Sequence, residues 1–227
     1  MTKPTYIEFI GPAGSGKSTT CEYFVKQLID EGYRIKSREK SDKLGLLSFC
    51  LRNPIYLTRS FFLSSRLSRT FNKNRQKIRK GFFKDLIILR YLLEKNSDMV
   101  MYDQGIFFRI IKTQRESADY YSQEKIYGDI LKLLFRDVEV NLIFLDITEN
   151  ILAKRFLSRE PKGWPLEKKS IKEVEFYFKR NKKIRQKGYN YVKVISNKCV
   201  NVKSFNLDVE RPLEKNYFIF REKITKL

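Results

Sequence analysis

The stretch TYIEFIGPAGSGKST, residues 5 to 19, decides the fold. Residues 5 to 10 form a short β-branched and aromatic run, which favours a strand, and residues 11 to 18 fit the pattern G-x-x-x-x-G-K-[ST]. Apolar residues then recur at helical spacing as far as Leu28, before Gly32 ends the segment. A strand, a glycine-rich loop and a helix in this order are the context that a phosphate-binding loop requires. We therefore predict that the loop holds the phosphates of a nucleoside triphosphate.

Each residue type in this loop has a physical task. The glycines let successive backbone N–H groups converge on phosphate oxygens, and the helix that begins near Lys17 directs the positive end of its dipole at the same point. We expect Lys17 to reach the β- and γ-phosphates and the Ser18 hydroxyl to bind Mg²⁺, so ATP and Mg²⁺ are the expected cofactors. The predicted nucleotide-binding residues are Gly11, Pro12, Ala13, Gly14, Ser15, Gly16, Lys17, Ser18 and Thr19.

The composition predicts one α/β domain over residues 1–227 with an inserted segment, because no stretch separates two self-sufficient halves of the 227-residue chain. Three widely spaced cysteines form no disulfide framework or zinc pattern. Histidine is absent, which excludes an imidazole base, so a general base must be a carboxylate. The first residues contain no apolar leader and no apolar run is long enough for a membrane span, which predicts a cytoplasmic location.

The pattern along the rest of the chain alternates strands and helices. Further strands are predicted at 33–38, 99–102, 140–146 and 191–195, and helices at 106–112, 123–135, 149–159 and 171–187. Pro54 and Gly81 are expected to divide a basic helical insertion over residues 41–96. The tail from 206 to 227 is expected to be a helix end packed on the domain.

Four places in the sequence, in this order, resemble the thymidylate kinase-like and deoxynucleoside kinase-like branch of P-loop kinases. They are the P-loop followed by Thr19-Thr20, then Ser37-Arg38-Glu39, then Tyr102-Asp103-Gln104-Gly105, and finally the segment LAKRFLSR at 152–159. The last is similar to the arginine-bearing lid helix of those families, so residues 150–187 are expected to form a lid and a following basic helix. The resemblance implies a P-loop three-layer sandwich, with a five-stranded parallel sheet and a site at the carboxyl ends of its strands.

Two departures from the family pattern bear on the acceptor. Lys40 replaces the proline that follows Glu39 in those kinases, and Gln104 stands where thymidylate kinases place an arginine that grips the acceptor phosphate. A neutral amide leaves that phosphate without a bidentate partner, which argues against thymidylate as the acceptor. The D-Q-G sequence with a long basic insertion looks more like uncharacterised thymidylate kinase-like proteins found among bacterial surface-polysaccharide functions.

The candidate catalytic residues are Lys17, two carboxylates and two arginines. We expect Asp103 near the metal and Glu39 near the acceptor hydroxyl, since both end strands beside the P-loop. Helix capping or a structural ion pair is the alternative for each carboxylate. Arg155 and Arg159 are four residues apart, so we expect them to share a helix face and clasp the phosphoryl transition state, with an ordinary solvated face as the alternative. Asp146 is expected to cap the helix that follows it.

The charge is concentrated in one segment. The net charge is +21, and no acidic residue lies between Asp42 and Asp85. Three interpretations stay open for residues 43–84: a solvated cover of the acceptor pocket, a surface for anionic lipid at the inner membrane face, or a nucleic-acid contact. The eleven cations in this segment are Lys43, Arg52, Arg59, Arg66, Arg69, Lys73, Arg75, Lys77, Arg79, Lys80 and Lys84.

Taken together, these patterns predict an ATP- and Mg²⁺-dependent small-molecule kinase. Its expected acceptor is a nucleoside, a nucleotide, a sugar or a glycan precursor. A nucleic-acid-associated P-loop NTPase and a nucleotide-binding regulator with little turnover are the alternatives, and a homodimer also stays open.

Overall fold

The centre of the molecule is a five-stranded parallel sheet. The computed structural model describes residues 3–36, 43–71, 74–95, 98–114, 120–161 and 163–224. The strands lie in the order β2-β3-β1-β4-β5, and every neighbouring pair is parallel, so all carboxyl ends meet at one edge. They are β1 (Thr5–Ile10), β2 (Ile35–Lys36), β3 (Met99–Tyr102), β4 (Glu139–Asp146) and β5 (Val202–Asp208). This confirms the predicted α/β fold with a five-stranded parallel sheet.

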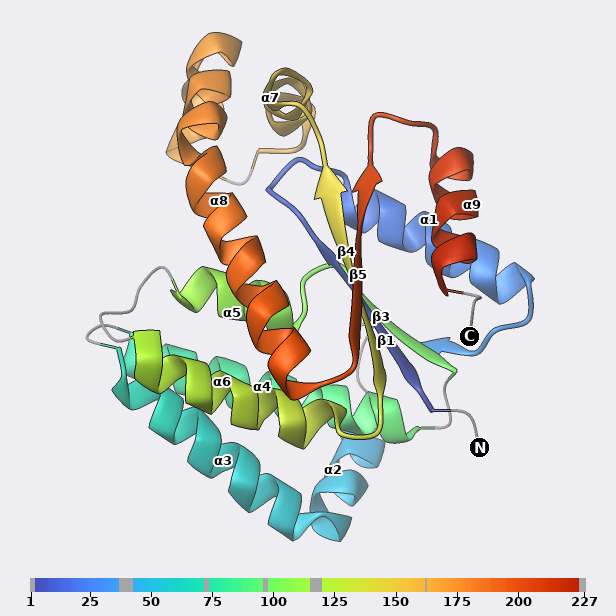
Figure 1. The fold of residues 1–227 in the computed structure, drawn as a ribbon, viewed down its shortest axis with the longest axis vertical. Helices are drawn as coiled ribbons and strands as arrows, with labels where there is room; N and C mark the ends of the chain where they lie inside the picture. Colours follow the sequence, from blue (N-terminus) through green and yellow to red (C-terminus); the bar gives the residue numbers. More distant parts are fainter. Residues whose placement is uncertain are drawn as a thin grey trace.

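Helices cover both faces of the sheet, which is why the whole of β1 is buried (Figure 1). On one face α1 (Lys17–Asp30) and α9 (Leu213–Ile224) pack Phe24 and Phe220 against the sheet. The opposite face carries the larger core, in which Tyr6 and Phe107 pack with Phe135. The helices that contribute to that core include α4 (Arg75–Glu94), α5 (Ile106–Gln114), α6 (Tyr120–Phe135) and α8 (Ile171–Cys199).

The carboxyl-terminal part of the fold differs from the sequence prediction. Residues 191–195 belong to α8 and not to a strand, and the last strand is β5, followed by α9. A capping box starts α8: the Ser170 N–H donates to the Glu173 carboxylate at 2.9 Å. Val192 and Ile195 are buried three residues apart, which fits the helical period, whereas a strand would place them on opposite faces. The predicted tail therefore contains the end of a strand and a complete helix.

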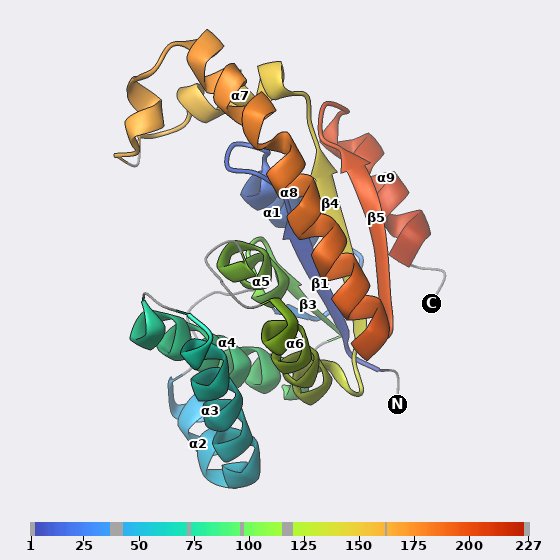
Figure 2. The same cartoon turned by 60° about the vertical axis from the view of Figure 1, so that its left-hand side comes forward.

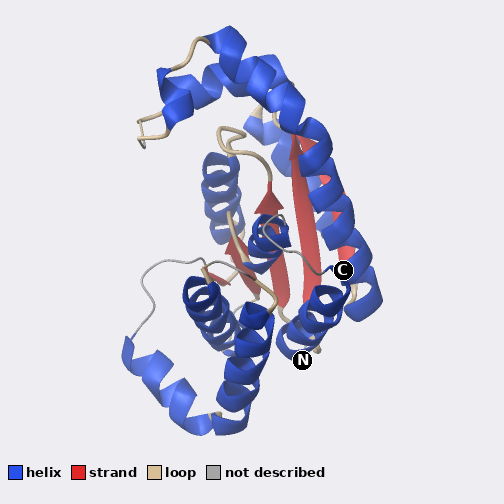
Figure 3. Cartoon of the chain, turned by 90° about the vertical axis from the view of Figure 1, so that its left-hand side faces the viewer, coloured by secondary structure: helices blue, strands red, loops and turns tan. Residues whose placement is uncertain are grey.

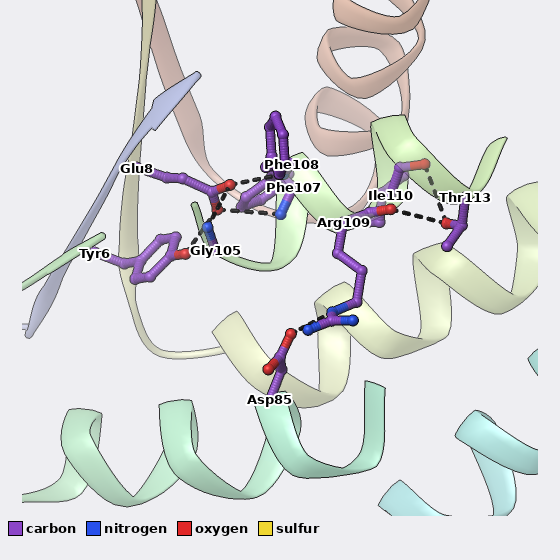
Figure 4. Close-up of polar contacts among 9 residues, drawn as sticks. All are labelled: Tyr6, Glu8, Asp85, Gly105, Phe107, Phe108, Arg109, Ile110 and Thr113. Atoms are coloured by element: carbon purple, nitrogen blue, oxygen red, sulfur yellow. Dashed lines mark hydrogen bonds and ion pairs between the residues drawn. The ribbon is translucent and has the colours of Figure 1, made fainter. Parts of the chain in front are cut away.

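The insertion folds into α2 (Lys43–Arg52), α3 (Pro54–Arg69) and α4. Proline at the first position of α3 divides the segment as predicted. Gly81 does not, because α4 runs through it without a break. A Cβ at Gly81 would lie 2.5 Å from a guanidinium nitrogen of Arg109, so this glycine makes room for a side chain from α5. Arg109 pairs there with Asp85, which joins α4 to α5 (Figure 4).

The insertion and the lid lie at opposite ends of the sheet. The helices α2 and α3 extend past the amino ends of the strands, whereas α7 (Glu149–Ser158) and the start of α8 lie at the carboxyl ends (Figures 1 and 2). Figure 3 shows the same separation from the side, with the sheet between the two groups of helices. No helix in the described ranges is both long enough and apolar enough to cross a membrane.

Candidate active site

The phosphate-binding loop joins β1 to α1 at the carboxyl edge of the sheet. Gly14 and Gly16 have φ angles of 86° and 82°, in the left-handed region that favours glycine. A Cβ at Gly14 would lie 3.1 Å from the Cα atom of Phe156, so α7 packs directly on the loop. Helix α1 begins at Lys17 and points its first turn at the loop. The sheet and this loop together define the class of P-loop nucleotide-binding folds.

The lysine of the loop is held in place by the loop itself. The Lys17 ammonium donates a hydrogen bond to the Pro12 carbonyl oxygen at 2.7 Å, and its nitrogen lies 5.9 Å from the centre of the Phe108 ring. The residue is only 6% exposed. A buried cation on a flexible stem is therefore positioned beside the backbone groups that would face a phosphate.

Ser18 and Asp103 meet beside the loop, although they lie on different elements. The Ser18 hydroxyl in the first turn of α1 donates to the Asp103 carboxylate, just after β3, at 2.8 Å. A hydroxyl oxygen and a carboxylate oxygen are ligands of the kind that Mg²⁺ prefers, so this pair fits the predicted metal site. The residues with described placement contain no cluster of three or more acidic, Cys or His side chains that could hold a metal. Glu39 lies outside the described residues.

A buried carboxylate that the sequence analysis missed anchors the turn after Asp103. Glu8 on β1 is fully buried and accepts four hydrogen bonds (Figure 4). Oε1 accepts from the N–H groups of Gly105 and Phe108 at 3.0 and 2.6 Å. Oε2 accepts from the Tyr6 hydroxyl at 2.7 Å and the Phe107 N–H at 3.1 Å. Glu8 thus caps the first turn of α5 by accepting hydrogen bonds from its backbone N–H groups.

Burial and hydrogen bonding act in opposite directions on Glu8. Burial raises the pKa of Glu8 to about 7, while the hydrogen bonds from Tyr6, Phe108, Phe107 and Gly105 oppose that rise. The pKa of the Tyr6 hydroxyl is also raised, first by burial and then by the neighbouring carboxylate, so the hydroxyl stays a donor.

Glycine is required at the third position of the Asp103-Gln104-Gly105 turn. A Cβ at Gly105 would collide with the Tyr6 hydroxyl and the Glu8 carboxylate. The close approach lets the Gly105 N–H reach Glu8. Gln104 itself is exposed and lines the cleft in front of the loop. The D-Q-G sequence therefore combines a predicted metal ligand, an amide that faces the cleft and a close backbone contact.

The two arginines of the predicted lid lie at the cleft but in different surroundings. Arg155 donates to the Val209 carbonyl oxygen at 3.1 Å, and its guanidinium would lie 3.8 Å from a Cβ on Gly16. Arg159 pairs with Glu167 at 2.9 Å, and its guanidinium carbon lies 4.1 Å from the centre of the Phe156 ring. Helix α7 ends at Ser158, so Arg159 follows the helix with extended backbone and does not share its face as predicted.

One further expectation is corrected at this edge. The N-cap of α7 is Thr148 and not Asp146, because the chain continues for one more residue after β4 before it turns. None of the described residues of the insertion lines the cleft, so these residues do not form the cover that was one of the three interpretations of the insertion. That follows from the position of α2 and α3 at the amino ends of the strands.

The cleft is large and its charge has one sign. Its volume is about 1150 Å³, and its walls come from the P-loop, α5, the lid segment and α8. No aspartate or glutamate of the described residues lines it. Aromatic side chains on the walls include Phe108, Trp164 and Tyr189. The cationic side chains that line the cleft are Lys17, Lys112, Arg155, Arg159, Lys169 and Arg185.

Comparison with known proteins gives structural likenesses only. No protein-family model and no curated protein matches the chain. Deoxyadenosine kinase from M. mycoides with the products dCMP and dCDP is 16% identical, with a TM-score of 0.48 over 98% of this chain and 99% of that chain. The same enzyme with bound dATP is 17% identical, with a TM-score of 0.46 over 97% and 99%. Shikimate kinase from Bacteroides thetaiotaomicron is 11% identical, with a TM-score of 0.49 over 97% and 98%.

Proposed function

We propose that this protein is an ATP- and Mg²⁺-dependent phosphotransferase that acts on a small acceptor. The observation that carries the proposal is the contact of Ser18 with Asp103 beside a complete phosphate-binding loop. The cleft in front of them, at about 1150 Å³, exceeds the roughly 300–1,000 Å³ of a typical single-ligand pocket. A donor nucleotide and an acceptor therefore both have room.

Each of the candidate residues has a separate role in phosphoryl transfer. Lys17 exchanges its bond with the Pro12 carbonyl for the β- and γ-phosphates. Ser18 and Asp103 hold Mg²⁺, which when bound neutralises charge on the phosphates. Arg155 lies beside the loop, where it can stabilise the charge on the transferred group. With no histidine in the chain, Asp103 or Glu39 orients the acceptor hydroxyl.

The side chains that line the cleft narrow the choice of acceptor. A nucleoside, a nucleotide, a sugar or a glycan precursor would fit the class, and the six cationic side chains favour those that carry their own phosphate. Two of these cations, Lys112 on α5 and Arg185 on α8, belong neither to the phosphate-binding loop nor to α7. Gln104, which also lines the cleft, would present an amide to this acceptor at the position where thymidylate kinases have an arginine.

The test is transfer of labelled γ-phosphate from ATP to a panel of nucleosides, nucleoside monophosphates, sugars and sugar phosphates, with and without Mg²⁺. Lys17→Ala should abolish transfer and leave the fold intact, because it removes the cation that meets the phosphates. The matched control is Lys26→Ala, an exposed lysine on the same helix, which should transfer at the parental rate. Equal turnover by Lys17→Ala and the parent would overturn the proposal.

ATP hydrolysis that depends on added DNA or RNA, and falls steeply with salt, would favour the nucleic-acid-associated NTPase.

A further inference from the structure

The exposed face of α3 combines apolar and cationic side chains. Residues 55, 59, 62, 66 and 69 follow a spacing of four and three, so they lie on one side of the helix. Ile55 and Phe62 on this side are 70% and 61% exposed, and the other three positions are the exposed Arg59 and Arg69 and the half-buried Arg66. The opposite side of α3, with Ser64 and Leu67, is buried in the protein.

The preceding helix continues the apolar character. Leu44, Leu47 and Leu51 on α2 are 80%, 58% and 76% exposed and lie three and four residues apart. The other side of α2 packs on the core through Phe49, whose ring contacts Tyr91. With Phe61, which is 51% exposed, six large apolar side chains are exposed on two consecutive helices. This is more than scattered exposure and marks an interaction surface.

The charged residues between positions 43 and 84 are all positive. Arg59, Arg66 and Arg69 make no ion pair with a described carboxylate. The next helix of the insertion, α4, adds exposed cations three and four residues apart, namely Lys77, Lys80 and Lys84. No acidic residue interrupts residues 43–84. The partner of this surface must therefore supply negative charge together with an apolar phase.

We propose that the outward faces of α2 and α3 dock on the surface of an anionic lipid bilayer, with the leucines, Ile55 and Phe62 in the headgroup and acyl boundary and the arginines at the lipid phosphates. Helices with an apolar face and a cationic border lie in the interface in this way. The phosphates of a nucleic acid would bind the arginines, but a nucleic acid has no apolar interior that would bury the exposed leucines. A second copy would bring cation against cation.

The position of the surface fits this assignment. The helices α2 and α3 lie at the amino ends of the strands (Figures 1 and 2). None of their described residues lines the cleft. The exposed face of α3 therefore has no role in the cleft. Docking there would leave the mouth of the cleft at the other end of the sheet. The proposal does not depend on which acceptor the cleft takes.

The test is sedimentation of the full chain with vesicles of phosphatidylcholine, alone or with phosphatidylserine. We expect binding to the anionic vesicles at about 50 mM salt and much weaker binding at about 500 mM, because screening shortens the Debye length. The triple variant Arg59→Glu, Arg66→Glu and Arg69→Glu should weaken binding by about 100-fold or more. Its matched control reverses three exposed cations on one side of α8, Arg180, Lys183 and Lys187, and should bind like the parent.

A second variant separates lipid from the other partners. Ile55→Ser with Phe62→Ser keeps every charge and should weaken vesicle binding by about 10-fold or more. Both side chains are exposed, so a circular dichroism spectrum and ATP turnover should match the parent. Equal binding to neutral and anionic vesicles, or full binding by this double variant, would overturn the proposal. If the protein binds DNA or RNA but no vesicles, and the double variant still binds the nucleic acid, the surface is assigned to nucleic acid. If the protein is a dimer and the double variant is a monomer, the surface is assigned to a second copy.

Discussion

Replacing Glu8 by glutamine exchanges a buried carboxylate for an amide of almost the same size. The carboxylate oxygens accept four hydrogen bonds, two on each atom. A carboxamide keeps one acceptor oxygen and turns its NH₂ group toward two donors. A buried donor without an acceptor costs about 1–3 kcal/mol, so Glu8→Gln should lower the free energy of unfolding by at least about 2 kcal/mol at neutral pH.

The stronger test is the pH dependence of that difference. The folded-state pKa of Glu8, about 7, lies above its ordinary value of 4.5, so the folded protein holds the proton more tightly than the unfolded chain. Stability from this group is therefore fully present below about pH 4.5 and falls as the pH rises to about 7. The total loss is about 3 kcal/mol at about 1.4 kcal/mol for each pH unit.

Urea denaturation of the parent and of Glu8→Gln at about pH 5.5 and about pH 8.5 isolates this contribution. Other titrating groups are common to both proteins and cancel. The advantage of the parent over the variant should be about 2 kcal/mol larger at the lower pH, because only the parent can bind the proton. An advantage that is the same at both pH values within about 0.5 kcal/mol would refute the reasoning, and would mean that the four donors keep Glu8 ionised throughout.

Two further predictions concern the same edge of the sheet. Arg155→Ala and Arg159→Ala should each lower turnover, since a residue that stabilises transition-state charge contributes roughly 10³-fold to the rate. If both variants change turnover by less than about twofold in steady-state assays, the lid assignment is wrong. Gly105→Ala should lower the free energy of unfolding in urea by about 1–3 kcal/mol, because its Cβ collides with Tyr6 and Glu8. Unchanged stability of this variant would show that the turn can move away from β1.

The sequence was sufficient for the parts of the fold that local rules determine. The P-loop was predictable because glycine, lysine and serine must stand at fixed spacing between a strand and a helix. The position of Asp103 beside the P-loop was predictable because it follows a buried strand, and parallel strands bring their carboxyl ends together. The end of α8 was not predicted, because a short run rich in β-branched residues, such as 191–195, is ambiguous between a strand and a helix.

Glu8 escaped the sequence analysis because a polar residue within a strand usually marks a solvent-facing position. In a central parallel strand both faces are covered, so one charged residue in an apolar strand indicates a buried polar contact. That signal was present at Glu8, since β1 is otherwise apolar apart from Thr5 and the Tyr6 hydroxyl. Its partners, however, are backbone N–H groups about a hundred residues away, which no motif identifies.

The two sides of the cleft are held by interactions of different strength, and this bears on which side can move. Glu8 lies three residues before the P-loop and binds the turn after Asp103, so a buried carboxylate ties the phosphate loop to the predicted metal ligand. Arg155 is fixed through one carbonyl oxygen, and Arg159 through an ion pair whose side chains are 21% and 10% exposed. Releasing either arginine breaks one polar contact, whereas opening the Glu8 contacts would break four hydrogen bonds at a fully buried side chain. Closure over a bound nucleotide should therefore come from the arginine side, while the loop, Ser18 and Asp103 keep their positions.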